Sequence, residues 1–364
     1  MTVRVTKPEY NIRDKISLLE KPVGVTGAQL MKSETAREAG SIIGVGRKNL
    51  CINGNFKCWQ RGTSIASGAA GNVSNTYKYV TADRWQTYFY NSYARQEVVL
   101  PTGEQVYAIR ETQQVTRNFM THIIEDGGSI WYEGGDITIS FWARTSGKRT
   151  GVSLGIYFYD SWNSSQYTFT NVRSNVIIEG GQWKHYTVTA TIPGNASNRA
   201  HLAIEFDNNA YGSWYQLTSG EYWEFANVQI EKGSVATEFE YRSEAEELTL
   251  CQRYLVVYGG TDECHLGVAS AYNLSNINLS LALPTTMRTG LPSLSKVTDG
   301  TNWLQAYIGT TGTNSNPTPQ LGENSNNNVI RVYIPSAVSG SLTAGQALWC
   351  QVLPNAKLIV SAEM

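Results

Sequence analysis

Three residues of the chain match a hydrolase pattern, but their surroundings argue against that chemistry. Gly151, Ser153 and Gly155 have the GxSxG spacing of a serine nucleophile. Such a serine needs a sharp turn from a strand into a helix, which lifts its hydroxyl out of the sheet. Here the alternating stretch IYFYD follows and predicts that the strand continues. We interpret the match as coincidental and assign no catalytic residue.

Two carboxylates offer a second route to catalysis. Glu205 and Asp207 alternate along one predicted strand, so they lie on the same face about 7 Å apart. That separation is compatible with the carboxylate pair of a glycoside hydrolase. Solvated strand faces carry such pairs routinely, so we favour a structural interpretation and predict that the chain is not an enzyme.

Histidines and cysteines indicate neither a metal site nor a cofactor. The four histidines, His122, His185, His201 and His265, form no HExxH motif. The five cysteines, Cys51, Cys58, Cys251, Cys264 and Cys350, fit no CxxC or zinc-ligand spacing. We expect reduced, mostly buried thiols.

Aromatic side chains are the strongest candidates for binding. In the alternating stretches ITISFWAR, GIYFYD and HLAIEFD, one face carries the core residues Ile137, Ile139, Phe141, Ile156, Phe158, Leu202, Ile204 and Phe206. Trp142, Tyr157 and Tyr159 then point outward, on the polar side with Arg144 and Asp207. Sugar rings stack on such aromatics, while charged or amide groups bind their hydroxyls.

Nearby loops extend this candidate glycan-binding set. Trp162 lies in YDSWNSS, and Trp214 and Tyr215 lie in YGSWYQ. The complete set is Trp142, Tyr157, Tyr159, Trp162, Asp207, Trp214 and Tyr215. An equally good alternative is that a neighbouring subunit covers these aromatics, because protein interfaces are also rich in them.

Composition and charge exclude several partners. The chain has 29 basic and 30 acidic residues, so no positive field attracts a phosphate backbone, and we expect no nucleic-acid partner. The charged N-terminus lacks the apolar core of a signal peptide, and no run of 18 apolar residues occurs. We expect synthesis in a cytoplasm and no membrane insertion.

The chain divides into four predicted parts. Residues 1–48 form a helical segment in which Ile12, Ile16 and Leu19 share one face; a single apolar stripe needs an external partner, so we interpret it as an attachment segment. Residues 49–242 alternate with period two, as in a jelly-roll β-sandwich.

The remaining two parts follow a break in that alternation. Ser243 and Glu246 form a capping box, and Leu248, Cys251 and Leu255 follow at helical spacing, which predicts a linker helix over 243–255. Strand patterns return over 256–364 and predict a smaller β-sandwich, interrupted by GTTGTNSNPTPQLGENSNNN, which we interpret as a long exposed loop. The predicted fold class is mainly β, with a short helical N-terminal segment.

Several stretches of the sequence resemble a known family. NLCINGNFKCWQRGTS followed by YVTADRW resembles the start of a jelly-roll module of phage tail and virion structural proteins, NGxFxxWQRG with a later DRW. EFANVQIEKGSVATEFEYRSEAEELTLCQRYL resembles its last strand and following helix, so the resemblance spans roughly residues 49 to 255. KPEYNIRDKISLLEKPVGVTGAQLMKSETAREA is similar to the leader of marine and cyanobacterial phage proteins.

This resemblance implies a structural virion protein with a carbohydrate-binding-like jelly roll. We expect a tail-fibre or appendage protein, located in the virion, that attaches to other virion proteins through residues 1–48 and contacts host surface polysaccharide for host attachment. The resemblance also implies a homotrimer. Alternatives are a capsid decoration or head-fibre protein and, more distantly, a polysaccharide depolymerase.

The same resemblance suggests a structural calcium site, which the residues of this chain do not favour. Carbohydrate-binding jelly rolls often hold calcium with an acidic residue in the last strand. The matching position here is Asn227, which lacks the charge that calcium requires. We interpret Asn53, Asn55 and Asn227 as turn and backbone-bonding residues instead.

Overall fold

The computed structural model describes most of the chain after residue 47. The described residues are 48–66, 79, 81–87, 91–113, 119–125, 130–131, 133–146, 150–159, 167–192, 201–207, 217–289, 291–298, 300–338 and 342–363, with the backbone alone along parts of β5, β7, β8 and β10. The chain forms two compact units, residues 1–50 and 51–364. The helices predicted within 1–48 lie outside the described residues.

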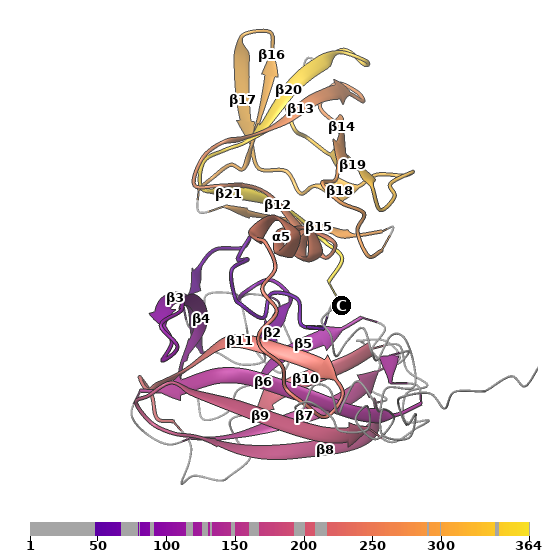
Figure 1. Cartoon of the computed structure of the whole chain (residues 1–364). Coiled ribbons are helices and arrows are strands. Elements are labelled where there is room, and N and C mark those ends of the chain that lie inside the picture. The colour runs from indigo at the N-terminus through magenta and orange to yellow at the C-terminus, as the bar shows by residue number, and fades with distance from the viewer. Residues whose placement is uncertain are drawn as a thin grey trace, which may run out of the picture. The chain divides into compact units, whose positions relative to one another are not determined.

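Residues 64–232 form two antiparallel sheets (Figure 1). The six-stranded sheet has the order β1 (Ser64–Ile65), β3 (Ser92–Val99), β4 (Gln105–Thr112), β11 (Tyr222–Lys232), β6 (Gly135–Thr145) and β9 (Lys184–Ile192). The five-stranded sheet has the order β2 (Trp85–Thr87), β5 (Phe119–Ile124), β10 (His201–Asp207), β7 (Thr150–Tyr159) and β8 (Tyr167–Ile178).

Aromatic residues from both sheets pack together in the core between them. Phe206 of β10 lies 5.4 Å from Phe141 of β6 and 5.1 Å from Phe225 of β11, measured between ring centroids. Ile137 and Ile139, which share the face of Phe141, are also buried, as their alternation predicts. The mainly β, two-sheet sandwich is therefore confirmed.

Helix α5 (Glu244–Gln252) follows the sandwich, and its start matches the capping prediction. The Ser243 side chain accepts a hydrogen bond from the backbone amide of Glu246. The helix ends earlier than expected, so Leu255 is the first residue of strand β12 (Leu255–Gly260), and the buried side of the helix also differs at Leu248. Cys251 is buried, and so is Leu255 just beyond the helix, but Leu248 is only half-buried and Glu247 takes the fully buried position instead.

Residues 255–361 form two further antiparallel sheets. One has the order β12 (Leu255–Gly260), β21 (Ala356–Ser361) and β15 (Ser293–Thr298). The other has the order β17 (Thr311–Ser315), β16 (Leu304–Ile308), β20 (Ala347–Val352), β13 (Cys264–Ala271), β14 (Ile277–Ala282), β19 (Val329–Ile334) and β18 (Gln320–Leu321). A shared core includes Trp303 and Val360.

The polar segment that was expected to be a long exposed loop instead supplies both edges of the seven-stranded sheet. Strands β17 and β18 lie within it, and β17 pairs with β16 in a tight hairpin. These strands are held by backbone hydrogen bonds and carry few apolar residues, so period-two hydrophobicity does not reveal them.

Candidate functional site

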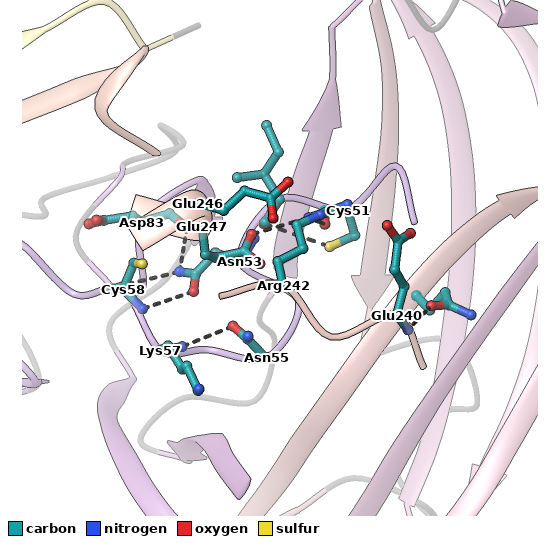
Figure 2. Close-up of polar contacts among 12 residues, drawn as sticks. Cys51, Asn53, Asn55, Lys57, Cys58, Asp83, Glu240, Arg242, Glu246 and Glu247 are labelled. Carbon is teal, nitrogen blue, oxygen red and sulfur yellow. Dashed lines mark hydrogen bonds and ion pairs between the residues drawn. The ribbon is translucent and has the colours of Figure 1, made fainter. Parts of the chain in front are cut away.

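The signature segment NGNFKCWQRG is buried and bonded to other parts of the chain. The side-chain nitrogen of Asn53, Nδ2, donates to the carbonyl oxygens of Cys58 (2.8 Å) and Asp83 (2.9 Å). Its side-chain oxygen, Oδ1, accepts from the Cys58 backbone amide at 2.9 Å (Figure 2). Asn53 has a φ of 58°, a left-handed conformation that asparagine tolerates. The Trp85 indole of the DRW motif donates to the Asn53 carbonyl oxygen, so the two motifs form one network.

An ion pair connects this network to α5. Arg242 Nη1 lies 3.2 Å from Glu247 Oε1 and donates to the Cys51 carbonyl oxygen at 3.0 Å (Figure 2). Glu247 Oε1 also accepts the Asn53 backbone amide at 2.5 Å. Because these groups are buried, each relies on the others to satisfy its charge or hydrogen bond.

The second half of the motif bonds to the chain that follows α5. Gln60 Nε2 donates to Asp83 Oδ2 (2.9 Å) and to the Leu255 carbonyl oxygen (2.8 Å). Burial raises the pKa of Asp83, and hydrogen bonds from Gln60 oppose that shift. Arg84 lies 3.5 Å from the centre of the Tyr254 ring. The signature residues therefore hold the fold together.

The cysteines and asparagines of this region are structural. All five cysteines carry thiols; four are buried and Cys264 is half-buried, as expected. Burial raises the pKa of the Cys251 thiol well above its usual value, so it is a poor nucleophile. The Asn53 side chain bonds backbone groups, and Asn55 accepts from the Lys57 amide, as expected for turn and backbone-bonding residues. Asn227 donates to the Tyr241 hydroxyl.

The serine of the GxSxG match lies inside a strand, as expected for a coincidental match. Ser153 is in the middle of β7, paired with Asn175 of β8 and with Asp207 of β10. The turn that a serine nucleophile elbow requires is therefore missing at this residue. Among the described residues, no group of three or more histidine, cysteine or acidic side chains is placed to hold a metal ion, and no helix is long and apolar enough to cross a bilayer.

The predicted glycan-binding residues are divided between sheets. Trp142 is on β6 of the six-stranded sheet, whereas Tyr157 and Tyr159 of β7 and Asp207 of β10 are on the five-stranded sheet. Only the backbone is described for the last three, and Trp162, Trp214 and Tyr215 lie outside the described residues. The structure therefore does not bring Trp142 together with Tyr157, Tyr159 or Asp207.

A row of charged residues crosses the outer face of the six-stranded sheet. Glu224 of β11 is in register with Arg110 of β4 and Arg144 of β6. Because its neighbour Phe225 points into the core, Glu224 points to the opposite face. Arg110 lies 2.6 Å from Glu224 Oε1 and Arg144 lies 2.5 Å from Glu224 Oε2. We call these three residues the charged row.

Aromatic rings flank the charged row and fix its arginines. The Arg110 guanidinium lies 4.1 Å from the centre of the Tyr222 ring, and that of Arg144 lies 4.8 Å from the centre of the Trp183 ring. The Glu224 side chain is 0% exposed, but those of Arg110 and Arg144 are 30% and 27% exposed. The arginines therefore have a fixed orientation and still contact solvent.

An apolar row runs beside the charged row, two residues along each strand. Ala226 is in register with Ala108 of β4 and with Trp142 of β6, and Trp142 is in register with His185 of β9. Trp142 is half-buried against an apolar cluster of Val98, Leu100, Val106, Ala108, Trp183 and Ala226. Trp142 lies on the face opposite the core, as the alternation along ITISFWAR predicted, but apolar neighbours cover part of its ring.

The sequence interpretation named Trp142 and noted Arg144, but it missed Arg110, Glu224, Tyr222 and Trp183. Alternation in YWEFAN contains part of the missing information, because Glu224 lies between the core residues Trp223 and Phe225. Strand order was needed to place them together.

Comparisons with known proteins give similar folds at low similarity. No protein-family model matches the chain, and no curated protein matches it. Among solved structures, the CBM22-2 xylan-binding domain of Paenibacillus barcinonensis Xyn10C is 14% identical, covering 46% of this chain and 97% of that chain, with a TM-score of 0.30. The enzymatically active domain of tailspike protein 4 of bacteriophage CBA120 is 14% identical, covering 41% of this chain and 19% of that chain, with a TM-score of 0.31. Values of this size do not define a function for this chain.

Proposed function

We propose that this chain is a non-enzymatic structural protein of a bacteriophage virion, a tail-fibre or appendage protein whose sandwich contacts host surface glycans. The charged row beside the apolar row on the six-stranded sheet is the observation that carries the glycan-binding part. The virion role rests on the resemblance of the NGxFxxWQRG, DRW and CQRY segments to phage structural proteins.

The paired rows have the chemistry that sugar recognition requires. A sugar ring has apolar C–H faces, which pack on an aromatic ring such as Trp142, and hydroxyls, which accept hydrogen bonds from guanidinium groups. Glu224 and the flanking rings hold Arg110 and Arg144 in place before any ligand arrives. Fixed donors lose little side-chain entropy on binding, which favours affinity.

Repetition of a weak site strengthens attachment. Aromatic stacking contributes about 0.5–1.5 kcal/mol beyond area burial, so one site of this kind binds weakly. A homotrimer, which we propose from the family resemblance, presents several copies together, and avidity then dominates host attachment.

Binding of the full chain to purified host surface polysaccharide tests this function. We expect Trp142→Ala and Arg144→Ala each to weaken binding about tenfold, by loss of stacking and of a charged donor. Val99→Ala is a matched control, since Val99 is an exposed residue of β3 outside both rows. Unchanged binding by both variants would disprove the proposed surface. Loss of oligomer assembly in Trp142→Ala, with no glycan bound by the wild type, would identify a subunit interface instead.

The location on the particle needs a separate experiment. Antibody labelling of isolated tails and of capsids distinguishes a tail fibre from a capsid decoration or head-fibre protein, which remains the alternative. A chain that lacks residues 1–48 should stay folded but fail to enter particles; normal incorporation would refute the attachment role of that segment. Release of reducing sugar from host polysaccharide would instead support the depolymerase alternative.

A further inference from the structure

The seven-stranded sheet carries a second pair of rows, far along the chain from the first. Trp349 of β20 is in register with Tyr307 of β16 and Val268 of β13, and Tyr307 is in register with Gly312 of β17. We call Gly312, Tyr307, Trp349 and Val268 the aromatic row. Gln351 is likewise in register with Gln305 and His265, and we call these three residues the amide row. The amide row lies two residues from the aromatic row on β20 and β16 and three residues from it on β13, whose register shifts between His265 and Gly267.

Both rows lie on the face opposite the core of this sheet. Leu348, Cys350 and Val352 are buried in the core, and Trp349 lies between the first two. Trp349 is 45% exposed and Val268 is 63% exposed, so the aromatic row is open to solvent. Gln351 shares this face by alternation, and its amide is buried by its neighbours in the amide row.

The two rings of the aromatic row are held in place. The Trp349 indole nitrogen donates to His265 Nδ1 at 3.2 Å. The Tyr307 hydroxyl donates to Gln305 Oε1 at 2.7 Å. A Cβ atom at Gly312 would lie 2.8 Å from Tyr307 Cε1, so this ring lies over a position that only glycine leaves open.

The amide row is ordered internally but keeps unused capacity. Gln351 Nε2 donates to Glu263 Oε2 (3.0 Å) and to Gln305 Oε1 (2.8 Å), so both of its protons are used. Gln305 Nε2, Glu263 Oε1 and His265 Nε2 form no hydrogen bond with any residue that the structure describes. Donors and acceptors therefore border the aromatic rings.

We propose that these rows form a second glycan-binding face, specific for neutral sugars. Tyr307 and Trp349 supply the stacking surface for a ring, and the amide row and Glu263 supply groups for its hydroxyls. The rows contain no lysine or arginine, and the Glu263 carboxylate repels anionic sugars. A second protein copy fits less well, because stable interfaces bury about 800 Å² per partner, and this patch has only three large apolar side chains.

Binding of the full-length chain to soluble polysaccharides tests this second face. The probes are neutral polymers (glucan, mannan, galactan and xylan) and acidic ones (alginate and hyaluronan), with affinities measured by titration calorimetry. We expect binding to at least one neutral polymer and weaker binding to the acidic ones. Trp349→Ala should weaken it at least tenfold, and Gly312→Ala, which displaces the Tyr307 ring without removing it, several-fold.

Two controls separate this proposal from its alternatives. Tyr272 is an exposed aromatic residue outside both rows, so Tyr272→Ala should bind as the wild type does. Comparison of Trp349→Ala with Trp142→Ala distinguishes failure of the sandwich surface from failure here, because each change removes a ring from only one of the two faces. The proposal is wrong if the wild type binds none of the neutral polymers, if Trp349→Ala binds normally, or if Trp349→Ala changes the molar mass in solution, which would show that copies of the chain cover the face.

Discussion

The carbonyl oxygen of Gly54 accepts a hydrogen bond of 2.9 Å from the backbone amide of Val228. This contact falls in the register shift of β11 between Ala226 and Gln229, next to Asn227, whose φ is 48°. The first glycine of the signature motif thus packs directly against the last strand of the sandwich.

This approach makes Gly54 intolerant of any side chain. A Cβ atom there would lie 2.0 Å from the Val228 carbonyl oxygen, a backbone atom that cannot move aside as a flexible side chain could, and 3.2 Å from the Cys51 sulfur. We expect Gly54→Ala to lower the free energy of unfolding by about 3 kcal/mol or more, as severe overpacking does. Chemical denaturation measures the change. Gly300→Ala is the control, because a Cβ atom there meets only Thr298 Oγ1 at 3.8 Å, and equal loss in both variants would contradict this account.

Glu247 is a second vulnerable position, since it is a buried charge that serves two partners. Glu247→Ala removes the carboxylate that pairs with Arg242 and accepts the Asn53 backbone amide, and breaking a buried pair typically costs about 3–5 kcal/mol. Glu244→Ala, in the exposed first turn of the same helix, should cost less than about 1 kcal/mol. Thermal and urea unfolding of both variants test the difference; a small effect of Glu247→Ala would show that Arg242 finds another partner.

His122 should make stability depend on pH. Burial, with the charges of Arg84 and Arg242, lowers the pKa of His122 well below 6.5, so the folded state holds it neutral. The unfolded chain binds a proton at this histidine more readily than the folded protein does. The free energy of unfolding is therefore highest above the unfolded pKa and falls as the pH decreases below about 6.5.

We expect this group to lower the free energy of unfolding by about 1.4 kcal/mol for each unit by which the pH falls. His122→Gln should remove that part of the slope between pH 6.5 and 5. Phe206→Leu, which also perturbs the core but leaves His122 in place, should keep it. If the free energy of unfolding of His122→Gln changed with pH as steeply as that of the wild type, the pH dependence would belong to other groups.

The region around α5 contains a pair of leucines with different expected effects. Leu255 is 0% exposed, so Leu255→Ala should cost about 2–5 kcal/mol. Leu248 is only half-buried, so Leu248→Ala should cost clearly less. Melting temperatures of the two variants compare them directly, and a larger loss in Leu248→Ala would mean that the helix buries its other side.

Local patterns made some of this structure predictable. Alternation over residues 137–141 correctly predicted which face of β6 points into the core. The Ser243 and Glu246 pair correctly predicted the start of α5. Both features depend only on residues that are close together in the sequence. The division of the chain at residues 48, 242 and 255 stays a prediction.

Features that depend on long-range strand order were not predictable. The charged row joins Arg110 to Glu224 across 114 positions, and nothing near either residue specifies that β4, β11 and β6 are adjacent. The aromatic row likewise needs the order β17, β16, β20 and β13. Strands β17 and β18 were missed because polar sequence forms a sheet edge without an apolar face.

The hydrogen bond from Arg242 to the Cys51 carbonyl oxygen brings the start and the end of the sandwich segment to one point. Because the two ends of this segment lie close together, its strands and loops can change in number, length or sequence without altering the path of the chain before and after it. Exchange of residues between these two positions for those of a related sandwich is therefore a minimal route to a different sandwich surface, provided that Arg242, Glu247 and the Asn53 network are kept.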